Sequence, residues 1–267
     1  MSTAHKIIKY FALAFAVAII FGIVQLIYQI GNAIFSEDEL LSELKVYEFN
    51  NQFEELDLDI NAARLAIKVG NFRVETNSEK IKVVNEGKKL VVKDKSTNWF
   101  HISSKISDVI VTLYIPEELL LDKVEIETGA GKVEIDKLSA NKLNIELGAG
   151  ETIINKVVVN KDFKLNTGAG SFTIKDGVIN NFDCDLGVGE TNITGVLLGE
   201  SEIDSGVGEL NINILDYADN YSFEVSKGVG TINYNGISVK DGSVLGNGSN
   251  HVSISGGVGE INIKTKQ

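Results

Sequence analysis

Proline and cysteine are nearly absent from this sequence, and each scarcity limits the fold. The 267 residues include one proline, Pro116, and 26 glycines. Because proline cannot donate a backbone hydrogen bond within a sheet, this composition suits a protein built from many short hydrogen-bonded strands. Its turns must rely on glycine, asparagine and aspartate. The one cysteine, Cys184, cannot form an intramolecular disulfide, so no covalent crosslink stabilises the fold.

Basic side chains are also scarce. The chain has 25 lysines and arginines against 37 acidic residues, which gives a formal net charge of −12. Such a charge repels nucleic acid and anionic lipid, so we exclude nucleic acid as a partner. Hydrophobic residues make up 43% of the chain, which is enough for a sizeable core.

A long uncharged run lies near the N-terminus. Residues 10–35 carry no charged side chain, and the run is longer than the roughly 20 residues that a helix needs to cross a bilayer. It exceeds the apolar core of a secretory signal and lacks a small-x-small cleavage site, so we predict an uncleaved, single-pass membrane helix. Lys6 and Lys9 precede it, which places residues 1–9 in the cytoplasm and the C-terminal domain outside the cell.

Polar residues near the end of this run suggest two further features. Gln25, Gln29 and Asn32 share one helix face, where they would either hydrogen-bond a neighbouring helix or lie near the outer interface. The stretch Ser36-Glu37-Asp38-Glu39 has the form of a capping box. It predicts a short juxtamembrane linker helix over residues 36–45.

The motif Gly-Ala-Gly or Gly-Val-Gly recurs seven times. Its first glycines stand at positions 129, 148, 168, 187, 206, 228 and 257, in steps of 19, 20, 19, 19, 22 and 29 residues. A period of about 20 residues indicates a solenoid, in which coils stack because none buries its apolar face alone. Apolar residues recur three positions before and six after each first glycine. We therefore predict an all-β, single-stranded parallel β-solenoid (β-helix) over residues 124–267, with two short strands per coil.

The rest of the domain plan follows from this repeat. The glycines should turn the chain between strands, by positive φ or by close approach to the next coil. The Ala or Val between them is expected to point into a narrow corner. Residues 46–123 lack the motif and are predicted to be irregular opening strands that cap the column. The two longest steps predict surface loops near Asp216–Tyr221 and Asn235–Asn250, where function can vary.

No catalytic, cofactor or metal motif is present. Every Gly-x-Gly copy lacks the third glycine of a dinucleotide fingerprint, and neither a calcium-binding nonapeptide nor a Gly-Lys-Ser/Thr phosphate loop occurs. His5, His101, His251 and Cys184 do not have the spacing of a metal site, and Cys184 falls in an inward column. We therefore predict no catalytic residue, no cofactor and no metal ligand; a ligand-binding site is not identifiable.

Two outward columns are the candidate surface features. Glu190 and Glu209 should lie one coil apart, where they would repel each other, share a cation or form a solvated ladder. In the adjacent column a structural amide stack is predicted from four residues: Asn192, Asn211, Asn233 and Asn262. Trp99-Phe100 is either a contact patch or packed under the cap.

The stretch "VTLYIPEELLLDKVEIETGAGKVEI", residues 111–135, resembles the bacterial β-strand repeat family named "putative adhesin", domain of unknown function 4097. The order of strand, lone proline, strand and Gly-x-Gly carries the resemblance, and the later copies are similar to the family's repeats. The resemblance covers roughly residues 46–267. It implies a β-solenoid on bacterial cell envelopes, often tethered by one N-terminal helix, with no established catalytic residues.

Three functions are compatible with these observations. The first is a membrane-anchored, outward-facing, non-catalytic module for binding, adhesion or structure, whose partner is a cell-wall polymer or an envelope protein. The second is an accessory of envelope-stress signalling that acts through the membrane helix. The third is a carbohydrate-active solenoid enzyme, which would need clustered carboxylates in a groove.

Overall fold

The computed structural model describes residues 44–50, 52–95 and 109–267. The predicted segment 1–9, the predicted membrane helix 10–35, residues 36–43 and the Trp99-Phe100 pair lie outside the described residues. Across the described ranges, no helix combines the length and the hydropathy of a membrane span. Lys45, which the sequence assigned to the linker helix, begins a strand instead.

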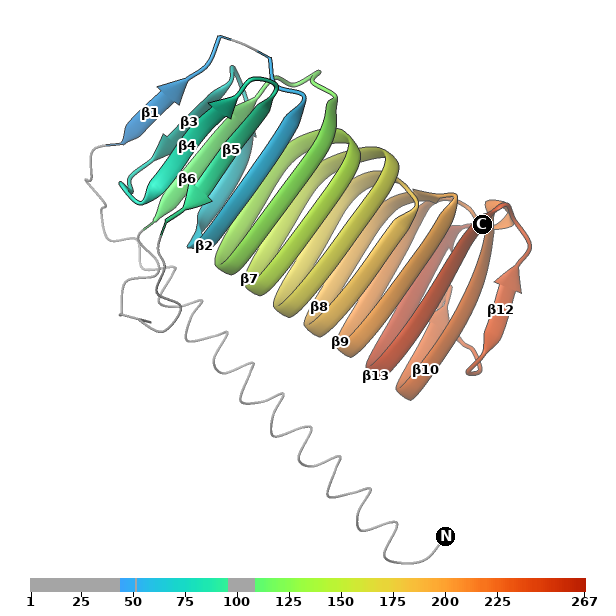
Figure 1. Ribbon diagram of the computed structural model, residues 1–267. Coiled ribbons are helices and arrows are strands. Elements are labelled where there is room, and N and C mark those ends of the chain that lie inside the picture. Colours follow the sequence, from blue (N-terminus) through green and yellow to red (C-terminus); the bar gives the residue numbers. More distant parts are fainter. Residues whose placement is uncertain (1–43, 51, 96–108) are drawn as a thin grey trace, which may run out of the picture. The chain divides into compact units, whose positions relative to one another are not determined.

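The described chain is all-β apart from one 3₁₀ turn (Figure 1). Its elements are β1 (Lys45–Glu48), β2 (Glu55–Val69), β3 (Arg73–Thr76), β4 (Ile81–Glu86), β5 (Lys89–Asp94), β6 (Ile110–Ile115), β7 (Leu121–Asn180), β8 (Phe182–Leu198), β9 (Glu200–Tyr217), η2 (Ala218–Asn220), β10 (Tyr221–Tyr234), β11 (Ile237–Ser238), β12 (Ser243–Gly246) and β13 (Asn250–Lys266).

The long strands are coils of a column and pair in parallel with one another. β7 alone is 60 residues long and holds the first three glycine motifs. In the pairing of β7 with β8, Gly170 stands opposite Gly189. In the pairing of β8 with β9, Gly189 stands opposite Gly208. Like positions therefore lie above one another, and the predicted stacking of glycine corners is confirmed.

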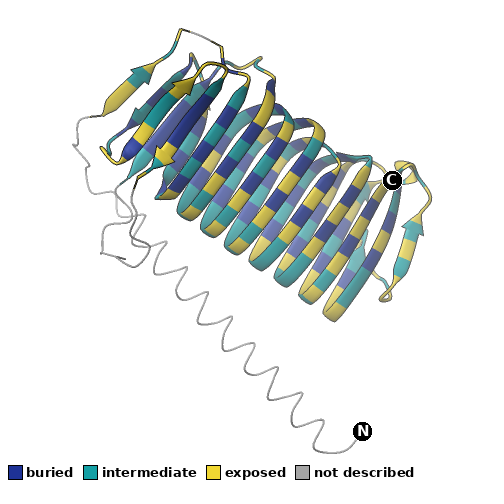
Figure 2. Ribbon diagram, in the orientation of Figure 1, coloured by how far each residue is buried: buried dark blue, intermediate teal, exposed yellow. Residues whose placement is uncertain are grey.

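Each coil is one continuous strand bent at the glycine corner, not the two short strands that were predicted, and its two arms lie on opposite sides of a shared core. The inward isoleucines six residues after the first glycine are at most 1% exposed: Ile135, Ile154, Ile174, Ile193, Ile212 and Ile263. On the other side of each corner, Phe163 and Phe182 stack within the core with ring centroids 4.9 Å apart. Buried and exposed residues alternate along every coil (Figure 2). The core is thus a continuous apolar filling between two outward faces.

Glycine is required at the corners because neighbouring coils approach too closely for a side chain. A Cβ at Gly187 would lie 2.0 Å from the carbonyl oxygen of Gly168, and a Cβ at Gly189 would lie 1.7 Å from that of Gly170. The second glycine of the motif also has a φ of +148°, which side-chain-bearing residues rarely adopt. The backbone of one coil occupies the space that a side chain on the next would need.

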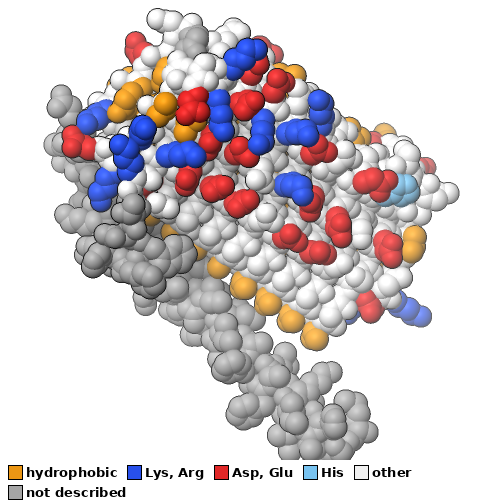
Figure 3. All heavy atoms as spheres, viewed as in Figure 1, with side chains coloured by type: hydrophobic (Ala, Val, Ile, Leu, Met, Phe, Trp, Pro, Cys, Tyr) orange, Lys and Arg blue, Asp and Glu red, His pale blue; other side chains and the backbone are white. Residues whose placement is uncertain are grey.

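The residue between the glycines lies at the corner, as predicted, but its side chain is not part of the core. Val188, Val207 and Val258 are half-buried, Val229 is 51% exposed, and none is among the side chains packed against the core. The inward side chains stand three and five residues before the first glycine, but four and six residues after it. The alternation of inward and outward side chains is therefore shifted by one residue at the turn. The valines therefore stay on its outer side, and hydrophobic side chains follow the lower edge of the column in Figure 3.

The coils are not stacked wholly in chain order. β13, which holds the seventh motif, pairs in parallel with β9 on one side and with β10 on the other. The order in space is β8-β9-β13-β10. The expectation that each turn stacks on the one before it is therefore wrong for the sixth copy, which does not pair with the fifth, whereas the seventh copy pairs with both. This order explains the 22-residue spacing between the fifth and sixth motifs. The chain must pass from β9 to β10 across the width of an additional strand, and η2 lies in that connection.

The regular column begins upstream of residue 124. β2 pairs in register with the first coil of β7, with Asn61-Ala62-Ala63 at the position of the glycine motif. On its other side, β5 pairs with residues 55–59 and β6 pairs with residues 64–69, so neither of these strands covers Ala62 and Ala63. A side chain therefore fits at this corner, which explains why β2 lacks the motif.

Short antiparallel strands cover both ends of the column. At the first end, β4 pairs with β5, β3 pairs with β6, and β1 pairs with β3. At the other end, β11 and β12 both pair antiparallel with β10. The predicted loop over residues 235–250 is therefore a capping segment, which contains these two strands. Such caps block the open edges at which another chain would add.

Asp57 in β2 provides a test of how the first cap is attached. Its carboxylate lies 2.9 Å from Lys89 Nζ and 3.4 Å from Lys93 Nζ of β5. Burial alone would raise the pKa of Asp57, but the hydrogen bonds and charges of the two lysines outweigh it and lower that pKa. A lowered folded-state pKa means that the carboxylate stabilises the fold above the unfolded value of about 3.9, and that this contribution is lost as the pH falls through the folded pKa.

We expect Asp57→Asn to reduce the free energy of unfolding by about 1 kcal/mol at pH 7, measured by urea denaturation. The difference from the parent chain should shrink once the pH falls below about 3.9. Asp204→Asn is the control, because Asp204 is exposed and makes no ion pair within the described residues. An equal loss of stability at both pH values would contradict the ion-pair explanation.

Candidate binding surface

Four asparagines form a continuous hydrogen-bonded ladder on one outward face. Asn211 Nδ2 donates to Asn192 Oδ1 at 3.0 Å, Asn262 Nδ2 donates to Asn211 Oδ1 at 3.0 Å, and Asn233 Nδ2 donates to Asn262 Oδ1 at 2.9 Å. The predicted amide stack is confirmed, with Asn262 and Asn233 in the reverse of their chain order. Each amide is half-buried and fixed by its neighbours in the adjacent coils.

A row of three glutamates runs beside this ladder. Glu190 stands opposite Glu209 in the pairing of β8 with β9, which confirms that the two are one coil apart, and Glu209 stands opposite Glu260 in the pairing with β13. The ladder orients the row, since Asn192 Nδ2 donates to Glu190 Oε1 at 2.8 Å and Asn211 Nδ2 donates to Glu209 Oε1 at 3.0 Å. All three carboxylates are exposed. We name these glutamates and the four asparagines the Asn–Glu face.

Metal binding finds no support in this geometry. Within the described ranges, no group of three or more His, Cys, Asp or Glu side chains is arranged to hold a metal ion. His251 is exposed at the start of β13, and Cys184 is 1% exposed in the core. Burial raises the pKa of the Cys184 thiol well above its usual range, helped by the negative charges of Asp185 and Asp183. Cys184 therefore remains a neutral core side chain.

The opposite face carries a second acidic row beside the glycine corners. A shallow groove of about 460 Å³ lies between coils at the start of the column, and Asp59, Glu127 and Glu146 line it. Burial raises the pKa of Glu127, and repulsion from Glu146 and Asp59 raises it further. Glu127 therefore binds a proton more readily than an isolated carboxylate does.

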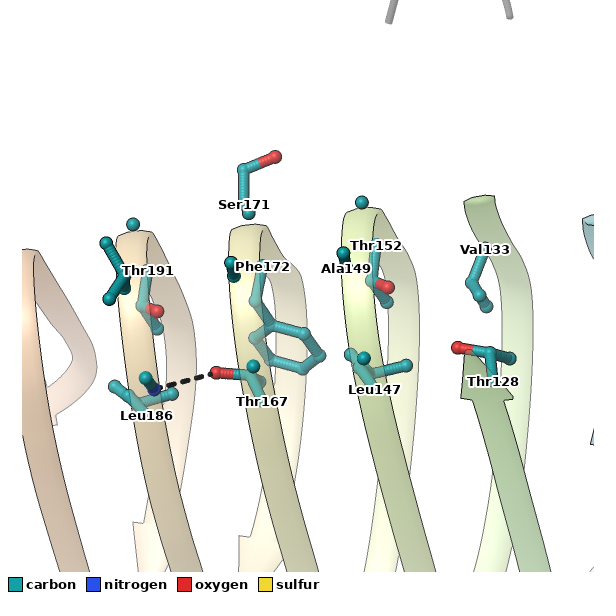
Figure 4. A pocket seen from close by; sticks show the side chains of 18 of the residues that line it. Thr128, Val133, Leu147, Ala149, Thr152, Thr167, Ser171, Phe172, Leu186 and Thr191 are labelled. Atoms are coloured by element: carbon teal, nitrogen blue, oxygen red, sulfur yellow. Dashed lines mark hydrogen bonds between the residues drawn. The ribbon is translucent and has the colours of Figure 1, made fainter. Parts of the chain in front are cut away.

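The hollow at the glycine corner is small. A hollow of about 30 Å³ lies inside the coils at the glycine corner, between Thr128, Leu147, Thr167 and Leu186 on one strand of each coil and Val133, Thr152, Phe172 and Thr191 on the other (Figure 4). Thr167 Oγ1 accepts a hydrogen bond from the backbone of Gly187 at 3.3 Å. The hollow would hold one or two waters, whereas small-molecule sites measure roughly 300–1,000 Å³. This hollow is therefore too small to be a small-molecule site.

Charge is distributed unevenly along the column. Over the described residues, the ion pairs occur from Lys45–Glu79 up to Lys164–Asp183, and none involves a later residue. Beyond that point lie exposed acidic residues without a basic partner, among them Asp185, Glu202 and Asp204. Figure 3 shows lysines and arginines gathered over the first strands and mostly acidic side chains over the last coils. The C-terminal coils are therefore the acidic end of the column.

The sequence identified most of the Asn–Glu face but not all of it. Glu190, Glu209 and the four asparagines were recognised from their columns, whereas Glu260 was not placed beside Glu209 because chain order puts β10 between them. The signal that could have found this contact is the 22-residue step between the fifth and sixth motifs, which is longer than one coil requires.

Comparison with family models gives a match that covers most of the chain. The model of the family described as "Toastrack DUF4097" matches residues 50–240. None of the curated proteins matches the chain. Among solved structures, a "putative cell adhesion protein" from Clostridium sporogenes is 19% identical with a TM-score of 0.40, and the match covers 84% of this chain and 98% of that one.

Two further structures are similar at the same level. A "putative adhesin" from Bacteroides fragilis is 15% identical with a TM-score of 0.31, and the match covers 83% of this chain and 97% of that one. A "putative lipid binding protein" from Parabacteroides distasonis is 14% identical with a TM-score of 0.33, with coverage of 84% and 96%. The family match therefore carries the assignment, and these three structures do not.

Proposed function

Since the chain belongs to the Toastrack DUF4097 family through residues 50–240, we propose that it is a non-catalytic binding module of a bacterial cell envelope. The observation that carries the proposal is the Asn–Glu face, where identical side chains repeat in register over adjacent coils. A stiff ladder presents equally spaced hydrogen-bonding groups about 4.8 Å apart. A surface of this kind suits a repetitive or extended partner, such as a cell-wall polymer or an envelope protein.

The proposal includes a location. Residues 10–35 would anchor the chain in the cell membrane as one helix, with residues 1–9 in the cytoplasm and the coils outside. Protease added to intact cells should then remove the coils while a cytoplasmic control protein survives. Protection of the coils under those conditions would reject the outward orientation.

Binding is tested with the full chain and purified envelope material. We expect the chain to be retained by peptidoglycan sacculi or by solubilised envelope proteins, and retention to fall when Glu190 and Glu209 are both changed to glutamine. The control is the pair Asp185→Asn and Asp204→Asn, which removes the same charge from the same coils on the opposite face. Equal retention of both variants, or no retention of the parent chain, would contradict a binding role for the Asn–Glu face.

A role in envelope-stress signalling is the alternative, and it depends on Gln25, Gln29 and Asn32. These residues lie outside the described part of the chain. Exchange of residues 10–35 for an unrelated membrane helix separates the two functions, since signalling should be lost and retention by the sacculi or envelope proteins kept.

A further inference from the structure

The position of β13 creates a feature that no other coil shares. β9 and β10 follow each other in the chain, yet they are not neighbours in the column, and one strand-wide slot separates them. Both edges of this slot run parallel to the strand that fills it. Until residues 250–266 enter, the backbone groups on those two edges have no partner.

The slot is specific for a strand with the coil pattern. Val252, Ile254, Ile261 and Ile263 continue the inward columns and are at most 3% exposed. At the corner, a Cβ at residue 259 would lie 1.7 Å from the carbonyl oxygen of Gly208, so the inserted strand must carry glycine there. Asn262 completes the asparagine ladder by donating to β9 and accepting from β10. The slot therefore accepts only a strand that has both the inward apolar residues and the Gly-x-Gly motif.

The ends of β13 are fixed by polar contacts as well. The His251 amide donates to the carbonyl oxygen of Gly199 at 2.9 Å, and the Gly199 amide donates to Asn250 Oδ1 at 3.1 Å. At the other end, the Thr265 amide donates to Asn235 Oδ1 at 2.9 Å. Every one of these contacts joins β13 to another element, so none requires that the two partners belong to the same molecule.

The segment leading into β13 can reach another molecule. Residues 239–249 separate Ser238 from Asn250 and include β12, so they span roughly 36–40 Å as eleven extended residues once the pairing of β12 with β10 opens. Gly248 crosses directly over the connection that bridges the slot, where its amide donates to the carbonyl oxygen of Tyr221 at 2.9 Å. A Cβ at this glycine would lie 2.0 Å from the carbonyl carbon of Asn220. β13 enters the slot directly after this crossing.

We propose that β13 is an exchangeable strand, so that two copies of this chain pair by each placing its β13 in the slot of the other. The exchange reproduces the contacts of β13 with β9 and β10, opens the pairing of β12 with β10, and closes by two-fold symmetry. The partner recognised by the slot is thus a second copy of this chain. This inference concerns self-association and is independent of the proposed envelope ligand.

The test uses single-cysteine variants of the full chain in detergent. Glu202 in β9 and Ser253 in β13 are exposed register partners, so one variant carries Glu202→Cys and the other carries Ser253→Cys. The two are mixed, incubated and treated with a short bifunctional thiol reagent; Cys184 is buried and is checked with the parent chain. We expect a crosslinked product at twice the monomer mass, which increases with protein concentration.

The matched control mixes Asp183→Cys with Glu202→Cys, which are register partners in the consecutive coils β8 and β9. It should give no product at twice the monomer mass, because those coils are not exchangeable. The proposal is overturned if the first mixture gives only monomer, whether or not a chain carrying both Glu202→Cys and Ser253→Cys crosslinks internally. An equal amount of dimer in the control mixture would also overturn it, since association would then not depend on β13.

Discussion

Replacement of Gly189 by valine is expected to unfold the coils on both sides of it. A Cβ at this position would lie 1.7 Å from the carbonyl oxygen of Gly170, and that oxygen belongs to the backbone of the adjacent coil, so it cannot move away alone. The φ of +148° adds strain for any β-branched residue. The clashing oxygen is held in place by the parallel pairing of the two coils. We therefore expect the free energy of unfolding to fall by more than about 4 kcal/mol.

The expected result is a chain that loses its cooperative thermal transition by circular dichroism and becomes sensitive to protease within β8. Gly87→Ala is the matched control, since Gly87 has a φ of +73° but a Cβ added there would have no neighbouring atom within 4 Å. That substitution should cost only about 1 kcal/mol of backbone strain. If the two variants were equally stable, backbone conformation and not close approach would explain the glycines.

The features that the sequence predicted well are those fixed by local chemistry. The glycines mark corners because no other residue fits there, and the inward isoleucines mark the core because they alternate on both sides of each corner. The asparagine ladder was predictable for the same reason, since residues at one position of the repeat must lie above one another. The glycines, the isoleucines and the asparagines can each be recognised from the residues of one coil and from the length of the repeat.

The features that the sequence did not predict depend on which coils are neighbours. All seven motifs carry the same pattern, so the pattern itself cannot show that β13 lies between β9 and β10. The identity of β2 as a coil was hidden for a related reason. Ala62 and Ala63 are tolerated because neither β5 nor β6 covers them on the outer side of β2, and the motif is therefore not needed.

Removal of residues 247–267 is expected to release the C-terminal end of the column and leave the rest folded. The truncation deletes β13 and exposes the edges of β9 and β10 together. In a solenoid each coil contacts only its neighbours, so coils distant from the deletion keep their own interfaces. Amide hydrogen exchange should therefore lose protection in β10, β11 and β12, whereas β7 and β8 should retain it.

A direct pairing of β10 with β9 is the outcome that would contradict this expectation, because protection in β10 would then survive the truncation. We expect that rearrangement to be unfavourable. The connection through η2 now spans the distance between strands separated by β13, and it would have to fold back on itself if β10 moved next to β9. Ser253→Ala is the control, because this side chain is exposed and its loss leaves β13 in place. Retained protection in this variant, together with its loss on truncation, would show that the strand between β9 and β10 holds the last coil in the column.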